Sequence, residues 1–222
     1  MMRPINPGKV LKYASLYDPV NTSRTLSRVN WVVRGRPITG SEQLKAWAQF
    51  QLTKFDEWSS GAFCDITDSS QNPPTGEAII DALLERGARE ISVTTLANEN
   101  ALYYPAAYRL SEITPRALEE ACSAIAPHPF AIAGFCTEQF HPVSVVLVSN
   151  PDDYGVCAGP SSFVMSLLGD LTKANQRFIR DHFHDSDMVR PDETSPVFGR
   201  KLVAVLEEYN RAGPGYTVIF PQ

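Results

Sequence analysis

The stretch 129–159, PFAIAGFCTEQFHPVSVVLVSNPDDYGVCAG, decides the fold of this 222-residue chain. Its segments 129–135, 143–149 and 154–159 are apolar and rich in β-formers. Short apolar runs bounded by turn residues are typical of buried strands. Only Asn-Pro-Asp-Asp separates the last two, and Pro151 suits the second position of a type I turn. The stretch therefore predicts three neighbouring strands, with short turns that favour antiparallel pairing.

Helix signals surround these strands. Thr75 and Thr114 are predicted N-caps, and each is followed by apolar residues at helical spacing. Apolar periodicity and punctuation predict five helices, over 75–87, 114–127, 159–169, 170–184 and 195–213. Further strands are predicted over 89–96, 101–110 and 215–220, and Pro105 favours a sheet edge for the second of these.

The N-terminal part gives a different pattern. Alternation of Val29, Trp31 and Val33 predicts a strand over 27–35 with one buried face. The segment 39–58 carries aromatic and apolar residues near helical spacing after Ser41, a candidate N-cap, and is predicted to be a helix. Ser, Asp, Asn, Pro and Gly then predict a long surface loop over 59–76.

Together these elements predict an α+β fold with a mixed, mainly antiparallel sheet and helices packed on one face, because βαβ alternation is not sustained. The length suits a single domain over 1–222. The loop before Thr75 leaves open an N-terminal sub-lobe over 1–70.

Composition excludes several classes of function. The chain has 43% hydrophobic and 20% charged residues and a net charge of −5, as in an ordinary globular protein. Its densest basic patch, 32–37, holds two arginines, which is too few to follow a nucleic acid backbone. No segment approaches the about 18 apolar residues of a membrane span. No secretory signal or cofactor motif is present, so we expect a cytoplasmic protein without a cofactor.

The four cysteines, Cys64, Cys122, Cys136 and Cys157, have no CxxC spacing and are expected to be reduced thiols. Cys157 is the candidate nucleophile, since it lies just before the predicted helix start at Gly159 and Pro160, whose positive end would stabilise a thiolate. His141 or His182 would be the base of such a thiol-dependent hydrolase or transferase. The alternative is a buried cysteine that fills the core beside a turn.

Two other polar clusters are candidate sites. The backbone amides and hydroxyls of Ser161 and Ser162 would face an anion at the same helix start. Glu138 and His141 lie together in a short connection, where they would suit proton transfer. A metal-binding hypothesis uses the nitrogen and oxygen donors of "HFHDSD", which are His182, His184, Asp185 and Asp187. The two histidines converge only if the helix ends before them.

The hypothesis that the sequence favours is a non-catalytic protein-binding module, of the adaptor or toxin-neutralising (inhibitor) type. Its candidate anchors are Tyr103, Tyr104 and Tyr108, because tyrosines on an edge strand are suited to protein contacts. An acidic chain suits a basic protein partner. The sequence leaves a homo-oligomer open and favours neither nucleic acid nor membrane as a partner.

Overall fold

The computed structural model describes residues 11–35, 50–64, 73–96, 105–126, 128–149, 154–184 and 196–220. A seven-stranded sheet with the order β1-β6-β5-β7-β8-β9-β4 is its centre, and all its neighbouring strands are antiparallel. The strands of this sheet are β1 (Ala14–Leu16), β4 (Trp58–Cys64), β5 (Glu90–Thr95), β6 (Ala107–Leu110), β7 (Phe130–Phe135), β8 (Ser144–Ser149) and β9 (Tyr154–Pro160). The predicted α+β class and the mainly antiparallel sheet are confirmed.

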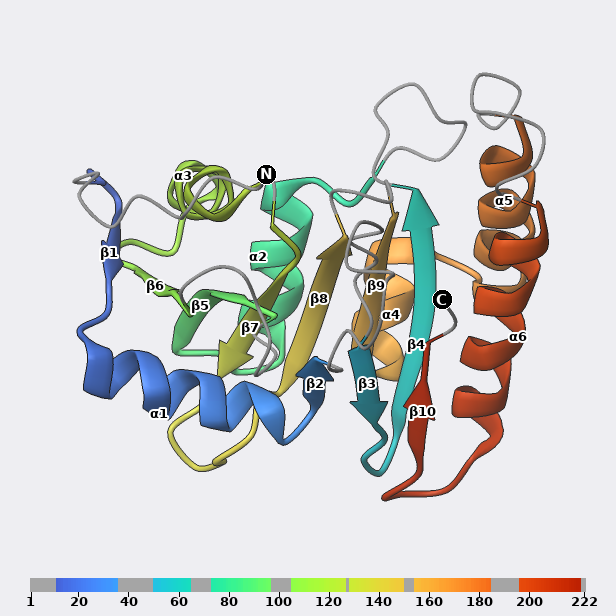
Figure 1. The fold of residues 1–222 in the computed structure, drawn as a ribbon, viewed down its shortest axis with the longest axis horizontal. Helices are drawn as coiled ribbons and strands as arrows, with labels where there is room; N and C mark the ends of the chain where they lie inside the picture. The colour runs from blue at the N-terminus through green and yellow to red at the C-terminus, as the bar shows by residue number, and fades with distance from the viewer. Residues whose placement is uncertain are drawn as a thin grey trace, which may run out of the picture.

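A smaller sheet packs in front of one half of the large one (Figure 1). Its strand order is β10-β3-β2, and both pairings are antiparallel. The strands are β2 (Val33–Gly35), β3 (Phe50–Thr53) and β10 (Thr217–Ile219). The small sheet therefore joins strands from near the two ends of the described chain.

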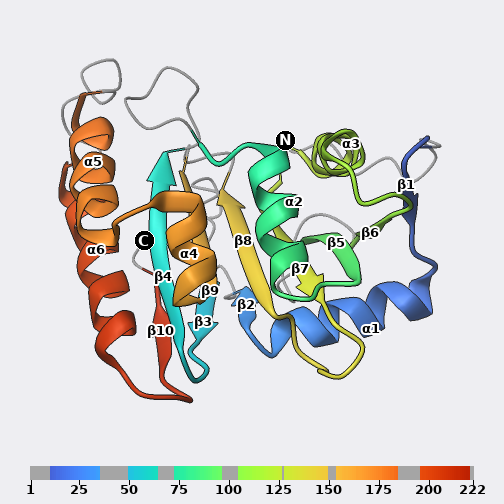
Figure 2. The same ribbon diagram turned by 180° about the vertical axis from the view of Figure 1, so that it is seen from behind.

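Helices cover the parts of the large sheet that the small sheet leaves open. The described helices are α1 (Pro19–Asn30), α2 (Gly76–Glu85), α3 (Pro115–Ile125), α4 (Ser161–Leu168), α5 (Leu171–His184) and α6 (Pro196–Arg211). Figure 2 shows α2, α3 and α4 side by side on one face of the large sheet, while α1 crosses the opposite face. The pair α5 and α6 packs along β4, which is an edge strand, and so covers that edge.

Two hydrophobic cores lie on opposite faces of the large sheet. On β7, Ile132 faces the core under α2 and α3, whereas Ala131 and Ala133 face the core under the small sheet. On β9, Cys157 faces the first core and Val156 the second. Both faces of the central strands are thus buried, which explains why 129–159 contains apolar runs rather than clean alternation.

The five helices predicted after residue 74 are confirmed within about two residues at the ends that the structure describes. The Oγ1 atoms of Thr75 and Thr114 accept hydrogen bonds from the backbone N–H groups of Ala78 and Ala117, as N-caps do. These helices were predictable because their caps and apolar stripes are local features of the sequence.

Several N-terminal predictions are wrong. The segment 27–35 contains the end of α1 and then β2, and Trp31 is exposed rather than part of a buried strand face. The helix predicted over 39–58 is replaced by β3 and the start of β4 over its described part, 50–58, and the loop predicted from 59 begins with the rest of β4. Pro105 does not mark a sheet edge, because β1 covers β6. The first 70 residues contribute strands to both sheets.

Candidate functional site

Helix α1 presents the first part of the candidate site. Asp18 caps it, with Oδ1 accepting the Asn21 backbone N–H at 2.8 Å, and Pro19 opens the first turn. Its buried residues, Thr22, Thr25 and Val29, face the large sheet. The helix ends at Asn30, and the Trp31 side chain that follows is 59% exposed.

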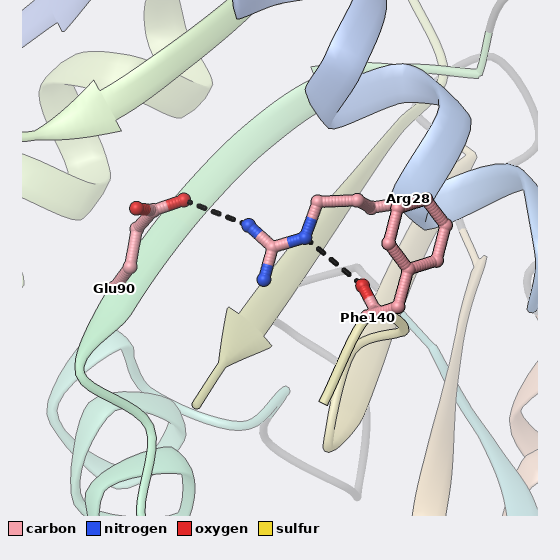
Figure 3. Close-up of polar contacts among 3 residues, drawn as sticks. All are labelled: Arg28, Glu90 and Phe140. Atoms are coloured by element: carbon pink, nitrogen blue, oxygen red, sulfur yellow. Dashed lines mark hydrogen bonds and ion pairs between the residues drawn. The ribbon is translucent and has the colours of Figure 1, made fainter. Parts of the chain in front are cut away.

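Arg28, in the last turn of α1, bonds to both the large sheet and the β7–β8 connection. Its Nε donates to the Phe140 carbonyl oxygen at 2.9 Å, and its Nη1 pairs with Oε1 of Glu90 on β5 at 3.4 Å (Figure 3). Its guanidinium carbon also lies 3.8 Å from the centroid of the Phe135 ring. One half-buried arginine therefore fixes the position of Phe140 relative to α1.

The exposed rings of Trp31 and Phe140 lie against each other, and we call this pair the aromatic ridge. Their centroids are 5.8 Å apart and their planes meet at 81°, an edge-to-face arrangement. Phe140 is 52% exposed, so more than half of each side chain remains in solvent. The other exposed large apolar side chains of the described residues are aliphatic or methionine: Leu16, Val20, Leu84, Met165 and Ile219.

A cavity of about 540 Å³, which we call the end cavity, is lined in part by residues of the β7–β8 connection. Gln139 and His141 line it, whereas Phe140 between them belongs to the ridge. Its lining residues are Phe55, Asp56, Trp58, Glu85, Arg86, Gln139, His141, Val143 and Pro160. They come from the β3–β4 turn, the end of α2, the β7–β8 connection and the end of β9.

Stacked rings form one wall of the end cavity. Phe55 stacks on the His141 ring with centroids 4.3 Å apart, and it contacts Trp58 at 5.2 Å. The turn carrying Phe55 includes Glu57 at φ 61°, a left-handed conformation that is uncommon outside glycine. The Glu57 carbonyl accepts the Ser161 backbone N–H at 3.1 Å, which holds the turn against the start of α4.

Ser161 and Ser162 lie beside the end cavity but already have protein partners. The Ser161 hydroxyl is 2.7 Å from the Ser59 hydroxyl. Arg86 at the end of α2 donates from Nη1 to the Ser162 Oγ at 2.8 Å. The structure thus brings His141, Ser161 and Ser162, three residues singled out from the sequence, to the same end of the large sheet. Glu138 is exposed in the same connection as His141.

Cys157 lies in the hydrophobic core and is fully buried. Desolvation raises the pKa of its thiol well above the usual range, so burial disfavours the thiolate that a nucleophile requires. It is not part of the end cavity, which His141 lines. The position matches the alternative of a cysteine that fills the core, and the thiol-enzyme hypothesis gains no support from it.

Of the three tyrosines predicted as binding anchors, the structure describes one. Tyr108 is buried on β6, where desolvation raises the pKa of its hydroxyl, so its ring packs in the core instead of anchoring a partner. Tyr103 and Tyr104 lie outside the described residues. The large aromatic side chains that are exposed among the described residues are instead Trp31 and Phe140, and sequence patterns missed both. The only signal for Phe140 was an aromatic residue inside a polar connection.

The described residues give no support to the metal-binding hypothesis. Helix α5 continues through His184, so the backbone stays helical at both histidines and the condition for their convergence is not met. Asp185 and Asp187 lie outside the described residues. Within the described ranges, no group of three or more His, Cys, Asp or Glu side chains is arranged to hold a metal ion.

No protein-family model, curated protein or solved structure matches this chain. No helix in the part of the chain described here combines the length and apolar character that crossing a membrane requires.

Proposed function

We propose that this protein is a protein-binding module that docks on a basic partner through the aromatic ridge. The observation that carries the proposal is the contact between two exposed aromatic rings, Trp31 and Phe140. Aromatic residues are enriched at protein interfaces, and tryptophan is among the residues that contribute most to binding free energy.

Contacts within the chain hold the ridge. Arg28 holds the Phe140 carbonyl, and Phe140 in turn packs against Trp31. Side chains that are already fixed lose less conformational entropy on binding. These contacts distinguish the ridge from a single exposed residue such as Met165, which is 52% exposed on α4.

The charge on the Phe140 side of the ridge indicates the chemistry of the partner. Glu138 is exposed in the β7–β8 connection, and Asp56 and Glu57 are exposed on the neighbouring β3–β4 turn. The whole chain carries a net charge of −5. Carboxylates around an apolar contact favour a basic partner and speed its association.

The test uses the partner that co-purifies with the untagged protein from its own host, identified and quantified by native mass spectrometry. Trp31→Ala and Phe140→Ala are each expected to weaken its affinity by about tenfold or more, as truncation of a central aromatic does. Met165→Ala is the matched control, because Met165 and Phe140 are equally exposed. The thermal unfolding of all three variants is measured alongside, since an exposed side chain should change it little.

Equal affinity in the native chain and both ridge variants would overturn the proposal. So would an equal loss in Met165→Ala.

A further inference from the structure

We infer that the end cavity binds a guanidinium group, presented by an arginine side chain of the partner. The inference deepens the proposed function and rests on it for the source of the arginine, but not for the chemistry of the cavity. Its volume of about 540 Å³ lies within the range of ligand pockets, about 300–1,000 Å³.

The first argument is charge. Asp56 on the β3–β4 turn and Glu85 at the end of α2 both line the cavity, and neither forms a salt bridge with any residue that the structure describes. The one arginine in the lining, Arg86, already donates a hydrogen bond to Ser162. Two carboxylates against one guanidinium leave an excess of negative charge, which favours a cation.

The second argument is the shape of that cation. Phe55 and His141, whose rings stack on each other, line the same cavity as the two carboxylates. A guanidinium is planar, stacks on aromatic rings and forms paired hydrogen bonds with a carboxylate, whereas an ammonium does neither as well. The lining therefore favours arginine over lysine.

The same combination already exists elsewhere in this molecule. Arg28 lies over the Phe135 ring at 3.8 Å while it pairs with the Glu90 carboxylate at 3.4 Å. An aromatic face and a carboxylate thus hold a guanidinium at the end of α1. In the end cavity, Phe55 and Asp56 supply an aromatic ring and a carboxylate, and His141 covers one face of that ring.

The position of the cavity connects it with the ridge. Gln139 and His141 line the cavity, and Phe140 between them forms part of the ridge. Phe140 is therefore bonded on both sides to residues that line the cavity. One short segment of the partner can therefore cover the ridge with an apolar side chain and place an arginine in the cavity.

The first experiment measures the cavity alone. N-acetyl-arginine amide, which carries only the guanidinium charge, is titrated into the full chain and followed by the NMR shifts of the backbone amides. The largest shifts are expected at the lining residues. N-acetyl-citrulline amide, which has the same shape without the charge, and N-acetyl-lysine amide should bind at least about fivefold more weakly, from the loss of one charge-assisted hydrogen bond.

The variants Asp56→Asn and Glu85→Gln should each weaken binding of the arginine probe by a similar factor. Glu77→Gln is the matched control, since Glu77 is an exposed carboxylate at the opposite end of the same helix. Citrulline binding equal to arginine would overturn the inference. Binding of inorganic phosphate in place of arginine would overturn it as well, because Arg86 would then define an anion site.

A second measurement separates this inference from the proposed function. If the partner supplies the arginine, Asp56→Asn weakens the binding of both the arginine probe and the partner. If Asp56→Asn weakens the binding of the probe alone, the arginine does not come from the partner and that part of the inference fails. Trp31→Ala should leave the probe affinity unchanged, so failure of the ridge as a docking surface is seen only with the partner.

Discussion

The ring of Phe63 occupies the space that a side chain on Gly155 would need. The two residues are direct partners across β4 and β9, and a Cβ built on Gly155 would overlap the ring. Gly159, four residues on, is similarly confined, since its Cβ would lie 2.9 Å from Cδ1 of Phe163. Cys157 lies between these glycines along β9 and belongs to the first core.

Gly155→Ala is therefore expected to destabilise the fold by about 1–3 kcal/mol, the usual cost of adding a methyl group to a packed core. Urea unfolding followed by circular dichroism measures the free energy of unfolding. Gly213→Ala is the control, because no atom lies within 4 Å of the Cβ position there. Equal unfolding free energies for the two variants would contradict this packing.

Cys157 is expected to resist thiol reagents in the native protein. Iodoacetamide followed by peptide mass spectrometry should modify the partly exposed Cys122 and Cys136 and leave the buried Cys64 and Cys157 unmodified. In urea all four should react. Preferential labelling of Cys157 in the folded chain would revive the thiol-enzyme hypothesis.

Asn210 on α6 pairs with the backbone of Ser60 on the edge strand β4. Its Oδ1 accepts the Ser60 backbone N–H at 2.7 Å, and its Nδ2 donates to the Ser60 carbonyl at 3.1 Å. Asn210→Ala leaves these buried backbone groups of β4 without a partner and should cost about 1–3 kcal/mol of unfolding free energy. Glu207→Ala, which changes an exposed residue of the same helix, should change the free energy of unfolding little. Chemical denaturation that gives the same midpoint for both variants would show that Asn210 is dispensable.

Asp18 makes the capping of α1 sensitive to acid. The backbone and side-chain N–H groups of Asn21 hold the pKa of the Asp18 carboxyl below its ordinary value of 3.8. A carboxyl with a lowered pKa stabilises the folded state fully above its ordinary value, and this contribution is lost as the pH falls through the folded pKa.

An NMR titration of the Asp18 carboxyl should therefore give a midpoint below 3.8. Asn21→Ala removes the side-chain donor and should move the midpoint towards the ordinary value, while the backbone donor keeps part of the shift. A midpoint unaffected by this change would show that the side chain of Asn21 does not contribute.

Sequence reasoning succeeded where the determinants are local. The caps at Thr75 and Thr114 fix helix starts within a few residues of the apolar stripe that follows, and the strands of 129–159 are neighbours along the chain. The start of α1 had a usable local signal as well. Asp18 followed by Pro19 is an N-cap and a first helical residue, whereas the alternation around Trp31 favours a strand.

The errors concern contacts between distant segments. Phe50 and Leu52 are buried on β3 because β2 and β10 pair on either side of it, and β10 lies at the far end of the described chain. No window around β3 contains that partner, so aromatic spacing was interpreted as a helix. The candidate site was hidden for the same reason. The ridge and the end cavity each combine side chains from different elements, and only the three-dimensional fold brings them together.

The pairing of Leu52 on β3 with Val218 on β10 also sets an order of events during synthesis. The chain segment of β3 is synthesised long before α6 and β10. Leu206 on α6 and Phe220, directly after β10, complete the core beneath the small sheet. The strands β7, β8 and β9 need only short loops to pair, whereas closing the long loop from β3 to β10 has a larger entropic cost. We therefore expect the core under α2 and α3 to form before the core beneath the small sheet, whose apolar side chains stay uncovered until α6 and β10 are synthesised.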